Sequence, residues 1–91
     1  MSDLAEDLAA LAQDELSEAG ALTWRELSKV VPWGDAYEGF TAAGRQVTVE
    51  RSYLWADGVG GDILCEVFAY RGASRYDAGV RLSRVIPKPR R

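Results

Sequence analysis

The fold of this chain is decided by residues 47–70, VTVERSYLWADGVGGDILCEVFAY. On both sides of a glycine-rich segment, apolar and polar residues alternate with a period of two, which is typical of β-strands. The glycines between the two runs, at residues 57–62, can supply the positive φ angles of a tight turn. We therefore predict two antiparallel strands, at residues 47–55 and 63–70, joined as a hairpin.

The same alternation returns further along the chain. After a connection at residues 71–79, Val80, Leu82 and Ile86 alternate with Arg81, Ser83 and Val85, which predicts a third strand. Residues 87–91, PKPRR, cannot continue a ladder because proline has no N–H. We expect a flexible basic tail there, following a single domain at residues 1–86.

The N-terminal part has the period of a helix. Residues 2–19 are expected to form an amphipathic helix, because their apolar residues recur at helical spacing. This apolar stripe consists of Leu4, Leu8, Leu11, Ala12, Leu16 and Ala19. A second helix is predicted at about residues 24–30. Thr23 and Glu26 form a capping-box pattern at its start, and Pro32 disfavours helical geometry after its end.

Residues 32–46 lie between the helices and the strands and are predicted to form an ordered loop, since they contain a proline and three glycines. The loop carries Trp33, Tyr37 and Phe40, whose large apolar surfaces are costly to leave in water. We expect these side chains to pack against the domain. One arrangement that achieves this folds the loop over a face of the sheet.

Together these elements predict a single α+β domain, in which two N-terminal helices pack on a three-stranded antiparallel β-meander. Ninety-one residues, of which 47% are hydrophobic, suffice for one domain with an apolar core. The N-terminus is acidic where a signal peptide would be basic and then apolar. No apolar run approaches the ~20 residues that span a bilayer. We therefore expect a soluble, cytoplasmic protein without a membrane partner.

The residue inventory excludes several kinds of site. The chain has no histidine and a single cysteine, Cys65, so zinc or iron–sulfur sites built on Cys and His cannot form within it. Cys65 lies in phase with the apolar face of its strand, which indicates a core residue rather than a nucleophile. We predict no catalytic residue, no metal site and no cofactor. The alternative is an enzyme that works through carboxylates alone, which requires a concave site holding two acids.

Charge divides the chain after Thr41. Residues 1–41 carry nine acids and two bases, a net charge of −7, and residues 42–91 carry nine bases and five acids, a net charge of +4. The two add to the −3 of the whole chain. Such an asymmetry indicates either that the halves neutralise each other in the fold or that two surfaces face charged partners.

The strand face turned away from the helices is the first candidate for a binding site. A sheet covered on one side usually has a polar outer face, but the pattern places Leu64, Phe68 and Tyr70 there, beside Arg81. Aromatic residues and arginine are enriched in the hot spots of protein interfaces. We predict a binding module of the adaptor or inhibitor type, whose partner is another protein or a second copy in a homodimer. If residues 32–46 cover this face, these side chains are internal instead.

A second candidate surface lies on the first helix, where Asp7, Asp14 and Glu18 are predicted to form an acidic face. A compact negative surface of this kind can occupy a basic groove on another protein, in place of nucleic-acid phosphates. The alternative is a solvated helix face that has no partner.

Nucleic-acid binding is the alternative function. The bases of the second half are nearly all arginine, which forms bidentate hydrogen bonds with phosphate. Phe68, Tyr70 and Tyr76 lie among them and could stack on bases. Two features oppose this function: the net charge is −3, and the arginines fall on both faces of the predicted strands.

Overall fold

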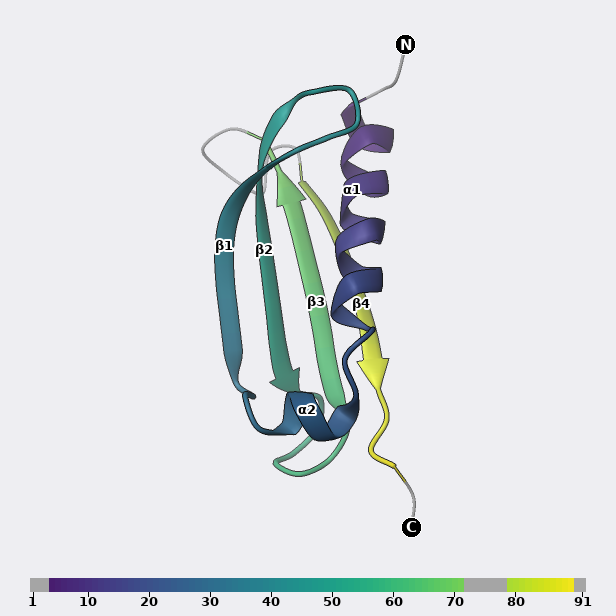
Figure 1. Cartoon of the computed structure of the whole chain (residues 1–91), viewed down its shortest axis with the longest axis vertical. Coiled ribbons are helices and arrows are strands. Elements are labelled where there is room, and N and C mark those ends of the chain that lie inside the picture. Colours follow the sequence, from purple (N-terminus) through teal and green to yellow (C-terminus); the bar gives the residue numbers. More distant parts are fainter. Residues whose placement is uncertain (1–3, 72–78, 90–91) are drawn as a thin grey trace.

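The computed structural model describes residues 4–71 and 79–89. Its elements are α1 (Leu4–Ala19), α2 (Trp24–Ser28), β1 (Trp33–Phe40), β2 (Gln46–Trp55), β3 (Ile63–Tyr70) and β4 (Gly79–Ile86). The strands form one antiparallel sheet in the order β1-β2-β3-β4, which follows the chain (Figure 1). The α+β class is confirmed, whereas the prediction of three strands is wrong because the sheet contains a fourth, β1.

The additional strand lies in the segment that was expected to be a loop, residues 32–46. β1 pairs with β2 along its whole length, from Trp33 opposite Tyr53 to Phe40 opposite Gln46. It therefore widens the sheet in its own plane. The segment does not fold over the outer face of the sheet, so this alternative is also wrong.

The turn between β1 and β2 fixes the register of their hairpin. The Thr41 N–H donates to the Arg45 carbonyl at 3.0 Å, and the Gly44 N–H donates to the Thr41 carbonyl at 2.9 Å. Gly44 has a φ of 85°, a left-handed conformation that glycine adopts without steric cost. The Thr41 hydroxyl also accepts the Arg45 N–H at 3.1 Å, so a buried side chain closes the turn.

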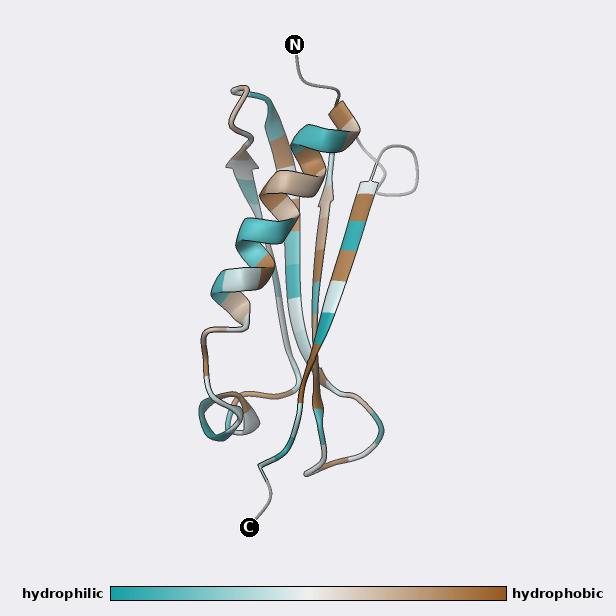
Figure 2. Ribbon diagram, turned by 90° about the vertical axis from the view of Figure 1, so that its right-hand side faces the viewer, coloured by the Kyte–Doolittle hydropathy of each residue, from teal (hydrophilic) through white to brown (hydrophobic). Residues whose placement is uncertain are grey.

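One face of the sheet, here called the inner face, packs against α1, which lies over β3 and β4 (Figures 1 and 2). The apolar stripe of α1 meets the alternating apolar residues of the strands. The resulting core consists of Leu8, Ala12, Leu16, Ala19, Leu27, Val47, Val49, Tyr53, Ile63, Cys65, Val67, Ala69 and Ile86. Burying each of the larger aliphatic side chains stabilises the fold by about 1.5–3 kcal/mol relative to leaving it exposed.

The second helix, α2, is shorter than the predicted 24–30 and covers the end of the inner face, where Leu27 is fully buried. Its start is the predicted capping box: the Thr23 hydroxyl accepts the Glu26 N–H, and the Glu26 carboxylate accepts the Thr23 N–H. The indole N–H of Trp24 donates to the Gly61 carbonyl at 2.8 Å. This bond ties α2 to the turn between β2 and β3.

After β4 the chain stays bound to the domain at Lys88. The Lys88 N–H donates to the Asp62 carboxylate at 2.8 Å, and the Lys88 ammonium lies 6.0 Å from the centre of the Trp24 ring. Residues 90–91 of the predicted tail and most of the predicted 71–79 connection lie outside the described residues. Within the described ranges, no helix combines the length and the apolar character needed to cross a bilayer.

Candidate functional site

The outer face of the sheet, opposite α1, is covered by no other helix or strand among the described residues. Its side chains follow from the strand registers. They are Gly34, Ala36, Glu38 and Phe40 of β1; Gln46, Thr48, Glu50, Ser52 and Leu54 of β2; Leu64, Glu66, Phe68 and Tyr70 of β3; and Gly79, Arg81, Ser83 and Val85 of β4. We call this set the outer face throughout.

At one end of the outer face three apolar side chains form a row across the strands. Leu54 pairs with Leu64 on β3, and Leu64 pairs with Val85 on β4. Leu54 remains 40% exposed and Val85 48% exposed. We call these three residues the apolar row. Leu64, between Leu54 and Val85, is half-buried. The three side chains are adjacent across the strands, in contrast to the scattered apolar residues of an ordinary protein surface.

Towards the other end, aromatic and charged side chains are joined in pairs. Phe68 and Tyr70 meet edge to face, with ring centres 6.5 Å apart, and the Tyr70 hydroxyl donates to the Glu50 carboxylate at 2.8 Å. Arg81 lies directly opposite Phe68. Its guanidinium donates to the Glu66 carboxylate through Nη2 and, at 2.8 Å, through Nε. These bonds hold the side chains in fixed positions on the face.

Between the apolar row and the aromatic pair lies a hollow of about 550 Å³. It forms where three small residues, Gly34, Ala36 and Ser52, lie next to one another on β1 and β2. Larger side chains, among them Phe68 and Arg81, line its edge. The outer face is therefore concave as well as partly apolar, a shape suited to receiving a side chain of a partner.

The four residues predicted for a partner surface on the strands do share one face. Leu64, Phe68 and Tyr70 are half-buried by their neighbours in the sheet, and Arg81 is exposed. The period of two was sufficient to place them together, because it fixes which side chains lie on the same side of a strand. Their role in binding remains a prediction.

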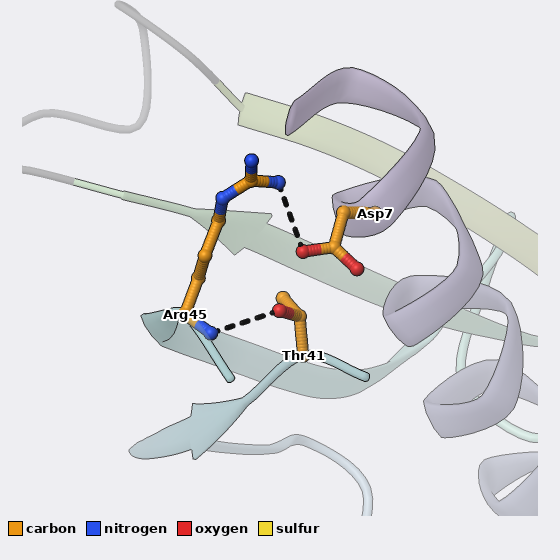
Figure 3. A network of polar contacts seen from close by, with 3 residues as sticks. All are labelled: Asp7, Thr41 and Arg45. Carbon is orange, nitrogen blue, oxygen red and sulfur yellow. Dashed lines mark hydrogen bonds and ion pairs between the residues drawn. The ribbon is translucent and has the colours of Figure 1, made fainter. Parts of the chain in front are cut away.

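The prediction that Asp7 belongs to an exposed acidic face is wrong. Its side chain is only 3% exposed and accepts a hydrogen bond from the Arg45 guanidinium at 3.1 Å (Figure 3). Asp7 lies three residues after Leu4 and four before Leu11, so it borders the apolar stripe of α1 and turns towards the sheet. It fastens the β1–β2 turn to the helix and is not available to a partner.

Asp14 and Glu18, the other two residues of the predicted acidic face, are exposed. The Glu18 carboxylate approaches Arg51 on the inner face at 4.0 Å. Because Asp7 is internal, the acidic surface of α1 is smaller than the sequence predicted.

A polar cluster that includes Arg51 lies between α1 and the inner face of β1 and β2, and sequence reasoning did not identify its other members, Glu15 and Tyr37. The Tyr37 hydroxyl donates to the Glu15 carboxylate, and an Arg51 guanidinium nitrogen lies 3.7 Å from the same carboxylate. Burial, together with the bond to Glu15, raises the pKa of Tyr37 to about 12. The signal for this cluster was the position of Glu15 within the apolar stripe of α1. Together with the Asp7–Arg45 pair, this cluster shows that the acidic and basic halves of the chain partly neutralise each other.

The arginines of the second half do not form one basic surface among the described residues. Arg45 and Arg51 pair with α1, and Arg81 pairs with Glu66. The outer face itself carries Glu38, Glu50 and Glu66, as its register shows. This distribution is unfavourable for a polyanion at the aromatic residues.

Two features bear on catalysis. Cys65 is fully buried, and its desolvation raises the pKa of the thiol, so it is held as the unreactive neutral form. Within residues 4–71 and 79–89, no group of three or more His, Cys, Asp or Glu side chains is arranged to hold a metal ion.

Compared with known proteins, the chain matches no family model, no curated protein and no solved structure. Its function is therefore inferred from its own surface.

Proposed function

We propose that this chain is a non-enzymatic protein-binding module that engages a partner protein through the outer face of its sheet. The observation that carries this proposal is the apolar row on a face that no described element covers: Leu54 and Val85 are exposed, Leu64 between them is half-buried, and a hollow lies on the same face. Covering such a row removes apolar surface from water at about 25 cal/mol per Å². That contribution supports an anchor for a partner.

The surroundings of the apolar row indicate the chemistry of the partner. Phe68, Tyr70 and Arg81 are of the residue types that dominate interface energetics. Glu50 and Glu66 lie among them, and both carboxylates already accept hydrogen bonds from neighbours on the face, Glu50 from Tyr70 and Glu66 from Arg81. A partner with an apolar side chain for the hollow and basic side chains around it complements this face in both shape and charge.

The same geometry favours binding over catalysis. The hollow does hold two carboxylates, which an enzyme of the carboxylate class requires. However, Glu50 accepts from Tyr70 and Glu66 accepts from Arg81, so both are engaged by neighbours. This arrangement suits fixed recognition groups rather than a pair that exchanges protons with a substrate.

Asp14 and Glu18 on α1 form a smaller, separate acidic patch that could extend the contact with a basic partner.

The experiment uses the full chain with a photoreactive amino acid at position 54, on the outer face, or at position 13, on the exposed side of α1. We expect a protein to be cross-linked from position 54 in cells of the native host and not from position 13. The cross-linked protein is then purified. Its dissociation constant is measured with the wild-type chain and with the Leu54→Ser/Leu64→Ser variant, and we expect binding at least tenfold weaker in the variant.

Val59→Ser is the matched control, because Val59 is apolar and 90% exposed but lies in the turn between β2 and β3. It should leave the affinity unchanged. Equal cross-linking from both positions would overturn the proposal, as would unchanged affinity in a folded Leu54→Ser/Leu64→Ser variant. Retention of short oligonucleotides at low salt, lost on removal of residues 88–91, would favour nucleic-acid binding instead.

A further inference from the structure

The sheet has two edges, each formed by a single strand. The sheet ends at β1 on one side and at β4 on the other, and no other described strand pairs with either edge. Figure 2 faces the β4 edge, with α1 beside it. An open edge presents backbone N–H and C=O groups that can pair with another strand.

The direction of these backbone groups follows from two bonds at the strand ends. The Thr41 N–H bonds the Arg45 carbonyl in the register of the β1–β2 ladder, and the Ala56 N–H bonds the Asp62 carbonyl in the register of the β2–β3 ladder. Successive residues of a strand point their backbone groups to opposite sides. The even-numbered residues of β1 and the odd-numbered residues of β4 therefore point outward, from the two opposite edges.

The charges of the two edge strands are complementary. β1 carries Asp35 on the inner face and Glu38 on the outer face, and β4 carries Arg84 on the inner face and Arg81 on the outer face. In one antiparallel register Asp35 lies opposite Arg84 while Glu38 lies opposite Arg81. The same register aligns the whole of β1 with the whole of β4, from Trp33 opposite Ile86 to Phe40 opposite Gly79.

We propose that copies of this chain join head to tail, with β1 of one copy pairing in this register with β4 of the next to form a continuous antiparallel sheet. The outward-pointing residues then meet as four hydrogen-bonded pairs: Gly34 with Val85, Ala36 with Ser83, Glu38 with Arg81, and Phe40 with Gly79. Each such pair exchanges two N–H···O bonds. The inner face of one copy then continues into the inner face of the next copy, and the outer face continues into the outer face.

The apolar side chains of the two edges also fit in this register. Phe40, which is 66% exposed, comes to lie opposite a glycine, and Val85 comes to lie opposite Gly34. On the inner face Tyr37 comes to lie opposite Leu82. Large residues thus face small or apolar ones, and no two charges of the same sign lie directly opposite each other.

Four side chains, Asp35, Glu38, Arg81 and Arg84, gain or change a partner on assembly. Glu38 accepts from the Gln46 amide at 2.6 Å in the single copy. In the single copy the Ala36 N–H, which points outward, is bound by the Asp35 carboxylate at 2.9 Å. In the assembly the Ser83 carbonyl of the next copy takes that N–H, and Asp35 turns to Arg84. Arg84 is exposed and lies against Gly20 at the end of α1, where a Cβ would collide with its guanidinium. Arg81 bridges Glu66 of its own copy and Glu38 of the neighbour.

Because each copy offers two different edges, the contact is heterologous: the assembly closes into a ring or grows as a filament. Val85 of the apolar row and Gly34 and Ala36 of the hollow lie at the junction, whereas Leu54 and Leu64 do not. The assembly therefore borders the proposed partner surface but does not require a partner. Sedimentation velocity of the full chain over a range of concentrations should show species larger than a dimer. These species should shrink in high salt, because two ion pairs are made at each junction.

Proline variants test the head-to-tail geometry. Proline is tolerated on an edge strand where its missing N–H faces away from the ladder, so Ala36→Pro blocks the β1 edge and Ser83→Pro blocks the β4 edge. Each variant alone should be monomeric. An equimolar mixture should form dimers of one copy of each and nothing larger, since one open β1 edge and one open β4 edge remain.

Several outcomes would overturn the proposal. They are a monomeric wild-type chain at all concentrations, a folded Ala36→Pro variant that still assembles, or a mixture that stays monomeric. Self-association of Ser83→Pro alone would instead indicate pairing of β1 with β1. If the proline variants fail to fold, the Asp35→Lys/Glu38→Lys variant should abolish assembly. Its control is Asp14→Lys/Asp57→Lys, which makes the same change of charge at exposed positions away from both edges and should assemble normally.

Discussion

The carboxylate of Asp7 connects the first turns of α1 to the turn between β1 and β2, two segments more than thirty residues apart in sequence. A buried carboxylate is tolerated only when it is paired and hydrogen-bonded. Arg45 supplies both the charge and the donor (Figure 3), while the Thr41 hydroxyl fixes the backbone of Arg45. A surface ion pair contributes little, but this one joins the helix to the sheet at a buried site.

Arg45→Met is expected to lower the free energy of unfolding by about 2–3 kcal/mol, because the buried Asp7 carboxylate loses its partner. Asp7→Ala should cost less, since it removes the buried charge itself. In the Asp7→Ala/Arg45→Met double variant the two losses should therefore not add. Urea unfolding of the four proteins measures this cycle. Additive losses would show that the two side chains do not interact.

At the level of single residues, the sequence predicted on which side of the sheet a side chain lies better than it predicted which side chains are buried. Leu64, Phe68 and Tyr70 were placed on one side because the period of two leaves no choice of side. Asp7 was misplaced because a helix has a broad border between its buried and exposed sides. Which border residue turns inward depends on a partner such as Arg45, far away in the sequence, and the helical pattern contains no information about that partner.

At the level of elements, β1 is the strand that the sequence did not reveal. Its residues, WGDAYEGF, show no alternation of apolar and polar, and its two glycines are depleted in strands. An edge strand whose faces are both partly exposed is under little pressure to alternate, in contrast to β3, which is buried on every second residue. What holds β1 in place is its ladder with β2 and the contact of Tyr37 with α1.

The Tyr37–Glu15 bond predicts how stability depends on alkaline pH. Burial and the bond to Glu15 raise the pKa of Tyr37 to about 12 in the folded protein, above the value of about 10 in an unfolded chain. The folded state therefore binds this proton more tightly. Its contribution to stability is complete below about pH 10 and is lost as the pH rises towards about 12.

Tyr37→Phe should lower stability at neutral pH and should make the loss of stability between about pH 10 and 12 shallower than in the wild type. Urea unfolding at a series of pH values measures both effects. Part of the alkaline loss should persist in the variant, because burial also raises the pKa of Tyr53. An unchanged alkaline profile would contradict the assigned role of Tyr37.

At the level of the whole molecule, the domain is long and thin. It measures 48 × 22 × 17 Å with a radius of gyration of 14.1 Å, against about 12 Å for a compact domain of this length. The cause is a single layer of long strands covered by one long helix (Figure 1). Such a shape leaves one sheet face and two strand edges as surface, and these are the surfaces to which we assign partner binding and assembly.

Amide hydrogen exchange tests the arrangement of the two edges directly. In dilute solution, where the chain is a single copy, β2 and β3 should be protected at nearly every residue because they have strands on both sides. In β1 the exchange rates of the amides should alternate along the strand, with Gly34, Glu38 and Phe40 exchanging fast and Tyr37 slowly. In β4 the odd-numbered residues should exchange fast instead of the even-numbered ones, so the amides of Arg81, Ser83 and Val85 should be fast and that of Leu82 slow.

Raising the protein concentration should protect the fast amides of β1 and β4 together, because each is the other's partner in the next copy. The amides of β2 and β3 serve as the internal control, since assembly leaves their ladders unchanged. Uniform protection along β1 in dilute solution would contradict the backbone directions deduced from the Thr41–Arg45 bond. Protection of β1 without β4 at high concentration would mean that β1 pairs with something other than the opposite edge.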